Sequence, residues 1–231
     1  MKFIYDEMRD EKGHVRENYR PYSRWLESVS AEVIARKRRE AELAFHRVGI
    51  TFAVYGDTVA KTERLIPFDI VPRIISAQEW RHVEAGLRQR VKALNAFLYD
   101  VYHDQNIIKA GRIPALQILG NAQYRKEMLG VDVPGHIYSH IAGIDLVRAG
   151  QGEYYVLEDN LRTPSGVSYM LEDRKVMMRL FPELFSSQAI APVEHYPDLL
   201  LDTLRSVAPI QDEHANVVVL TPGQYNSAYF E

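Results

Sequence analysis

Apolar residues recur at three- and four-residue spacing between residues 77 and 102, the pattern of one face of a long amphipathic helix. Ser76-Ala77-Gln78-Glu79 precedes the pattern and forms a capping-box signature for the helix start. We therefore predict a core helix that ends near Tyr102. The apolar stripe consists of Trp80, Val83, Leu87, Val91, Leu94, Leu98 and Val101.

Other helices are predicted from their end signals. Ser30 is a capping residue for a helix that runs to about Val48, and Gly49 marks its end. Further helices are expected near Tyr22–Val29 and over Val167–Leu180, and Pro197 opens another. The 1–29 segment, polar with scattered aromatic residues, is expected to pack on the body as an arm.

Short β-type runs lie outside these helices. Thr51–Tyr55 and Leu65–Val71 are predicted strands around a turn at Gly56-Asp57. Asn216–Leu220 is typical of a buried strand, and the Pro-Gly turn after it indicates the start of an α/β unit. We therefore expect the chain to be the front portion of a longer protein; a C-terminal strand that pairs elsewhere in the sheet is the alternative.

Two alternating runs predict a β-hairpin. They are His136–Arg148 and Glu153–Asn160, joined by the turn signal Ala149-Gly150-Gln151-Gly152. With a four-residue loop, Arg148 lies opposite Glu153 and Asp145 lies opposite Val156. A loop one residue longer or shorter would turn Asp145 to the other face.

This register collects oxygen ligands on one face of the hairpin. Glu158 and Asn160 are two residues apart on one strand, so their side chains share a face. Asp145 joins them from the neighbouring strand, diagonal to Glu158. Carboxylate and carboxamide oxygens suit hard cations such as Mg²⁺, which predicts a metal site. A hairpin with a polar, solvated face is the alternative.

An anion pocket is expected next to this site. Arg162 follows Asn160 by two residues and points the same way in an extended chain. The turn Thr163–Gly166 leads into the helix near Val167, whose N-terminus favours anions and whose cap Ser165 can supply. An ordinary capped helix with a surface arginine is the alternative.

Two further groups border the hairpin. Arg148 is interpreted either as a phosphate contact or as the partner of Glu153 in an exposed ion pair of little energetic weight. His136 and His140 would face away from Asp145, and no third ligand for zinc can be placed beside them.

Composition narrows the class of protein. The chain has 231 residues, 46% hydrophobic and 26% charged, as in ordinary globular domains. A net charge of -3 does not favour nucleic-acid binding, and the absence of cysteine excludes disulfides and thiolate chemistry. No apolar run approaches the roughly 20 residues of a membrane span, and no signal peptide begins the chain, so a cytoplasmic location is expected. P-loop, Rossmann and nucleophile-elbow motifs are absent.

Several motifs along the chain belong together: Tyr5–Met8, Gly49–Phe52, Pro67–Arg73, Gln89–Leu98, Gly143–Arg148, Leu157–Asn160 with Pro164–Gly166, and Leu220–Gly223. These motifs resemble the circularly permuted ATP-grasp family (type 2), which is similar in its site to glutathionylspermidine synthetases. The resemblance implies a partial permuted ATP-grasp fold of α+β or α/β class, with a metal-bearing antiparallel hairpin packed with long helices. It divides the chain into an arm and helix (1–48), a metal-binding portion (49–210) and the start of an α/β unit (211–231).

The resemblance implies an ATP-dependent carboxylate–amine ligase that works through an acyl phosphate. Asp145, Glu158 and Asn160 would hold Mg²⁺ ions that bridge the ATP phosphates. Arg162, which follows the metal strand, would serve catalysis. Arg148 at the end of the partner strand, and Ser165 and Gly166 before the next helix, would contact phosphate or the acyl substrate.

Two departures from the family pattern bear on this expectation. The synthetases carry an arginine two residues before the metal aspartate, where this chain has Gly143. The family's nucleotide-gripping lysines would lie beyond Glu231, so the chain alone is expected to bind ATP weakly or not at all and to lack full ligase turnover. A non-catalytic binding module and a Mg²⁺-dependent phosphoesterase are the alternative functions.

Overall fold

The computed structural model describes residues 5–49, 51–53, 63–65, 68–208, 215–221, 223 and 229. The chain forms two compact units. The first unit combines residues 1–75 with 165–231, and the second is residues 76–164. The predicted division at residues 48 and 210 does not coincide with these limits and stays a prediction.

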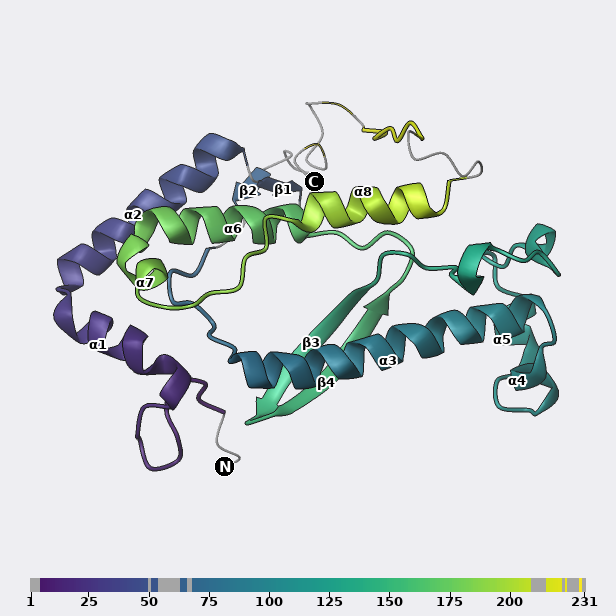
Figure 1. Ribbon diagram of the computed structural model, residues 1–231, viewed down its shortest axis with the longest axis horizontal. Coiled ribbons are helices and arrows are strands. Elements are labelled where there is room, and N and C mark those ends of the chain that lie inside the picture. The colour runs from purple at the N-terminus through teal and green to yellow at the C-terminus, as the bar shows by residue number, and fades with distance from the viewer. Residues whose placement is uncertain are drawn as a thin grey trace. The chain divides into compact units, whose positions relative to one another are not determined.

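The first unit is built mainly from helices. Its core lies where α1, α2, α6 and α7 meet, and Tyr22, Phe45, Val176 and Phe181 are its largest fully buried side chains. The α2 and α6 helices lie side by side (Figure 1). The elements are a 3-10 turn at Glu17–Tyr19, α1 Arg20–Ser28, α2 Ala31–Val48, the antiparallel pair β1 Thr51–Ala53 and β2 Glu63–Leu65, α6 Val167–Leu180, α7 Pro182–Ser186 and α8 Tyr196–Ser206.

Local end signals place these helices where the sequence predicts them. The Ser30 hydroxyl accepts a hydrogen bond from the Val33 amide at the start of α2, and Gly49 ends the helix at φ 76°. The Lys37 ammonium of α2 donates to the Leu180 carbonyl, which would otherwise be left open at the end of α6. The arm also packs as expected, because Tyr19 and Tyr22 are buried.

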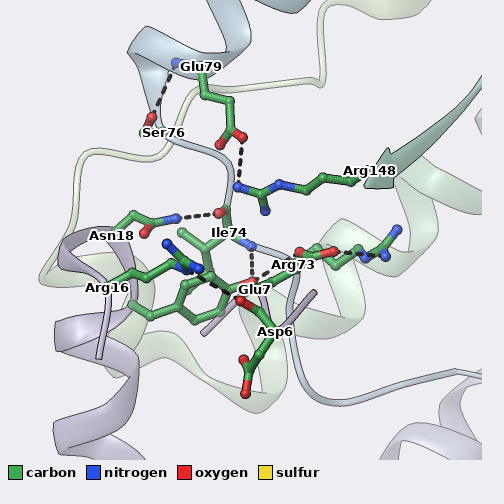
Figure 2. Close-up of polar contacts among 10 residues, drawn as sticks. Asp6, Glu7, Arg16, Asn18, Arg73, Ile74, Ser76, Glu79 and Arg148 are labelled. Atoms are coloured by element: carbon green, nitrogen blue, oxygen red, sulfur yellow. Dashed lines mark hydrogen bonds and ion pairs between the residues drawn. The ribbon is translucent and has the colours of Figure 1, made fainter. Parts of the chain in front are cut away.

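The arm is tied by polar contacts to the segment before helix α3, Ala77–Tyr102 (Figure 2). The Asn18 amide donates to the Ile74 carbonyl at 2.6 Å, and the Tyr19 hydroxyl accepts from the Ile74 amide at 2.9 Å. Arg73 forms an ion pair with Glu7 at 2.8 Å. These contacts explain how an irregular, polar arm becomes part of a folded unit.

Two strand predictions are wrong in the described part of the chain. Residues 68–71 are not a strand, because Ile70 is 2% exposed and packs into the helical core from an irregular segment. The turn predicted at Gly56-Asp57 lies outside the described residues. Asn216–Leu220 has no strand partner among the described residues, and Leu220 is 94% exposed.

The second unit is a long helix with a hairpin lying along it (Figure 1). The Ser76 hydroxyl accepts from the Glu79 amide at 3.2 Å and starts the helix as predicted. The His136 end of the predicted hairpin is not a strand, because Gly135 and His136 both adopt positive φ in a 3-10 turn. The elements are α3 Ala77–Tyr102, α4 Asn106–Lys109, α5 Ala115–Leu119, 3-10 turns at Lys126–Met128 and Pro134–His136, β3 Gly143–Gly150 and β4 Glu153–Asn160.

A carboxylate organises the far end of α3. Asp100 accepts the amides of Asn106 and Ile107, both at 2.9 Å, and so caps the short α4. The hydrogen bond from the Ile107 amide is the main cause that lowers the pKa of Asp100. Charge on this side chain therefore stabilises the turn between the two helices.

Candidate functional site

The hairpin β3–β4 carries the predicted metal residues on its open face. Asp145 is paired directly with Glu158, and Gly143 with Asn160. All three predicted ligands are exposed. Ile144, which precedes Asp145, and Asp159, which lies between Glu158 and Asn160, are only partly exposed. The alternation of the two strands therefore separates an open face from a face turned toward α3.

The predicted register is wrong, although the predicted face is right. Arg148 is paired with Tyr154 instead of Glu153, because the two-residue turn Gln151-Gly152 pairs Gly150 with Glu153 and the next residue, Ala149, is then left out of the pairing. The pairing leaves out Ala149 on β3 and Leu157 on β4, and each omission shifts the register by one residue. Since two single shifts restore the original alternation, the face of Asp145 is unchanged.

The three side chains supply oxygen donors on one face of the hairpin. The Asn160 amide nitrogen donates to the Glu158 carboxylate at 3.1 Å, which ties these two side chains together. Asp145 faces Glu158 across the strand pair, where like charges directly opposed are unfavourable. A divalent cation would relieve this repulsion, so the donor chemistry fits Mg²⁺. Among the described residues, no group of three His, Cys, Asp or Glu side chains lies close enough to hold a metal ion. The predicted site has only two such residues, Asp145 and Glu158, and its third donor is the amide of Asn160.

The other face of the hairpin is joined to α3 by ion pairs. Arg90 grips Asp159 with two hydrogen bonds, of 2.6 and 2.5 Å, and this contact lowers the pKa of Asp159. Arg148 pairs with Glu79 at 2.6 Å, and their side chains are only 6% and 12% exposed (Figure 2). The capping-box glutamate Glu79 therefore turns its carboxylate to the hairpin.

This placement bears on the two interpretations of Arg148. The structure does not bring Arg148 to the face of Asp145 and Glu158, and an exposed pair with Glu153 does not form. Arg148 instead forms a buried ion pair with Glu79, and its contact with phosphate stays a prediction.

Pro164 explains the glycine at position 143. An added Cβ at Gly143 would lie 2.8 Å from the Pro164 Cβ and 3.4 Å from the Asn160 Cβ. A side chain at this position therefore requires movement of the segment after β4. The arginine that the synthetases carry here has no room in this conformation.

The remaining predicted residues lie in the sequence after β4 and before α6. Arg162 is exposed in the bend after β4. Ser165 does not cap α6, because Gly166 at φ 104° is the capping residue and makes no side-chain cap. Arg162 belongs to the second unit and Ser165 and Gly166 to the first, so their joint role in an anion pocket stays a prediction.

The histidines do not join the metal residues. His136 stacks on Tyr99 at 4.3 Å between ring centroids, and His103 stacks on Tyr99 at 4.1 Å. His140 is exposed. These rings form a stacked group at the far end of α3.

Sequence reasoning missed the contribution of α3 to the hairpin. Glu79 and Arg90 are eleven positions apart, close to three helical turns, so they share one side of α3. Asp159 lies between Glu158 and Asn160 and must point to the opposite face. Both signals were present in the sequence, but only the packing shows which residues meet.

Comparisons with known proteins identify relatives of this chain. Residues 72–231 match the model of a family described as "A circularly permuted ATPgrasp". The uncharacterized protein sll0335 of Synechocystis sp. is 46% identical over 99% of this chain and 47% of its own length. The uncharacterized protein Rv2411c of Mycobacterium tuberculosis is 44% identical over 98% of this chain and 40% of its own length.

A third relative has a functional name. The protein named "Putative glutamate--cysteine ligase 2-3" in Frankia alni is 43% identical over 98% of this chain and 26% of its own length. The chain thus spans less than half the length of each of these relatives. In the described part of the chain, no helix combines the length and apolar character needed to cross a membrane. The family match covers more than half of the sequence, and the chain belongs to the circularly permuted ATP-grasp family.

Proposed function

We propose that this chain is the front portion of an ATP- and Mg²⁺-dependent carboxylate–amine ligase. Family membership supports a ligase of this kind, and so does the name of the Frankia alni relative. In the proposed reaction, a substrate carboxylate oxygen attacks the γ-phosphorus of ATP, which forms an acyl phosphate and releases ADP. The amine nitrogen then attacks the acyl carbon, a C–N bond forms, phosphate leaves and the nitrogen loses a proton.

The open face of the hairpin carries this proposal. Asp145 and Glu158 lie opposite each other, and Asn160 is hydrogen-bonded to Glu158. These side chains would hold Mg²⁺, which neutralises charge on the transferring phosphoryl group. Arg162 lies two residues beyond Asn160 and would bind the negative charge of the acyl phosphate.

Other predicted contacts have more limited support. Ser165 and Gly166 would meet phosphate through the start of α6, where the helix dipole favours an anion. We assign Arg148 a role in fixing the hairpin to α3 instead of a phosphate contact, because its guanidinium is buried against Glu79.

ADP release by the full-length protein tests the proposed activity. Glutamate with cysteine is the first substrate pair to examine, because the Frankia alni relative bears that name. We expect ADP to form only when Mg²⁺, an acid and an amine are all present. Phosphate release from an ester without ADP would indicate a phosphoesterase, and nucleotide binding without turnover would indicate a binding module.

A matched pair of variants locates the site. Glu158→Gln removes a proposed metal ligand and should abolish ADP release while the fold is kept. Glu153→Gln changes an exposed glutamate near the turn of the same strand and should leave activity unchanged. Activity that survives Glu158→Gln would show that the metal site is elsewhere.

A further inference from the structure

We propose that Arg90 is a positioning residue for the metal site, an inference that rests on the proposed function. Arg90 lies on α3, 69 positions before Asp159 in sequence, and does not itself lie on the open face. Its two hydrogen bonds hold Asp159, the residue between Glu158 and Asn160. Fixing Asp159 toward the helix therefore fixes both neighbours away from it.

The double contact sets a direction as well as a distance. Arg90 Nε donates to one oxygen of Asp159 at 2.6 Å, and a terminal nitrogen of Arg90 donates to the other oxygen at 2.5 Å. A planar guanidinium that binds both carboxylate oxygens restricts the rotation of the pair. The Asp159 side chain is 18% exposed and the Arg90 side chain 40%, so the two-point geometry of the contact, and not its burial, is what orients Asp159.

The strand needs such an anchor at this point. The pairing of β3 and β4 shifts by one residue at Leu157, which has no opposite residue and directly precedes Glu158. A one-residue change in register would turn the following side chains to the other face. Arg90 opposes this change, because it would carry Asp159 away from α3 and break two charged hydrogen bonds.

A second anchor follows Asn160. The Ser139 hydroxyl donates to the Leu161 carbonyl at 3.1 Å, and the Ser139 amide donates to Asn95 of α3 at 2.9 Å. Asn95 is a buried residue on the same helix as Arg90. The chain on both sides of Asn160 is thus linked to α3, and Asn160 is held between the two links.

Charge polarity makes the docking of the hairpin directional. Near its start α3 offers Glu79 to Arg148, and further along it offers Arg90 to Asp159. The reversed orientation would place Glu79 against Asp159 and Arg90 against Arg148. Two like-charge contacts would then replace two ion pairs, so the metal residues are kept at the Arg90 end of the helix.

Mn²⁺ affinity and amide exchange of the protein test this role together. Arg90→Gln should weaken Mn²⁺ binding about 10-fold or more, as loss of groups that orient ligands does in other sites. Exchange at residues 158–160 should become faster, while exchange at residues 154–156 should change little. Arg90→Lys keeps the charge without the double contact and should recover part of the affinity.

Arg88→Gln is the matched control. Arg88 is also an α3 arginine, but it pairs with Glu84 at 2.7 Å on an exposed part of the helix. Its loss should leave Mn²⁺ affinity and hairpin exchange unchanged. Unchanged affinity or unchanged exchange at residues 158–160 in Arg90→Gln would overturn the positioning role and leave the proposed function standing. If the unaltered protein and Glu158→Gln show the same lack of Mn²⁺ binding, the metal site itself is refuted and the positioning role with it.

Discussion

The buried ion pair between Arg148 and Glu79 is expected to control the stability of the second unit. Its side chains are 6% and 12% exposed, and the nitrogen and oxygen are 2.6 Å apart. Removing one member of a buried pair leaves the other charge in a poorly solvated place, which costs about 3–5 kcal/mol. Arg148→Met should therefore lower the free energy of opening of the hairpin by about that amount.

Hydrogen exchange measured by mass spectrometry checks this value locally. The chain has two compact units, so a single global unfolding midpoint would mix their contributions. A loss of about 3 kcal/mol corresponds to exchange more than 100-fold faster in the segment 143–160. Peptides from α2 and α6 in the other unit should be unaffected.

Two controls separate the buried charge from the loss of a side chain. The double variant Glu79→Leu/Arg148→Met removes both charges and should recover much of the stability, because neither member of the pair remains as a charge without the other. Arg88→Met breaks an exposed pair of the same helix and should cost about 0.3–0.5 kcal/mol. The reasoning is refuted if Arg148→Met accelerates exchange less than 10-fold, or if the double variant opens as readily as the single one.

Other substitutions and pH changes have defined expected outcomes. Gly143→Ala should destabilise the hairpin by about 1–3 kcal/mol, seen as faster hydrogen exchange in the segment 143–160, because the new methyl group meets Pro164; unchanged exchange would show that this segment yields freely. The lowered pKa of Asp100 means that its stabilising charge is present above its unfolded pKa of about 3.9 and is lost as pH falls through the folded value. Amides 106 and 107 should therefore exchange faster at pH 3 than at pH 5 after correction for intrinsic rates, and Asp100→Asn should reduce this difference. Asp145→Asn should remove a like-charge contact across the hairpin and stabilise it by about 0.2–1 kcal/mol without Mg²⁺, while ligase turnover is lost; retained turnover would exclude Asp145 as a ligand.

The candidate site shows where sequence reasoning succeeds and where it needs packing. The face shared by Asp145 and Glu158 was predictable, because side chains alternate along a strand and the parity of the loop was right. The pairing itself was not, because the turn has two residues instead of four and because Ala149 and Leu157 are left out of the pairing, which side-chain alternation does not reveal. The metal role of these residues is a prediction that metal binding has still to test.

Misplaced elements have a similar cause. Ile70 belongs to an apolar run that resembles a strand, yet its burial is satisfied by the helical core without any β-pairing. Ser165 is a good capping residue, but Gly166 at positive φ takes the capping position, and α6 begins at Val167 as predicted. Local propensity does not record such competing contacts.

The sequence by itself determined the long helices, their ends and the side of the hairpin that bears Asp145, Glu158 and Asn160. These features depend on near neighbours: a capping hydroxyl, a glycine at positive φ, or the period of side chains along one element. Only the tertiary structure decided that Arg148 is buried against Glu79, that Arg90 grips Asp159, and that Pro164 leaves no room for a side chain at position 143. Such contacts join residues far apart in sequence, and their choice depends on which surfaces pack together and which charges would otherwise be buried alone.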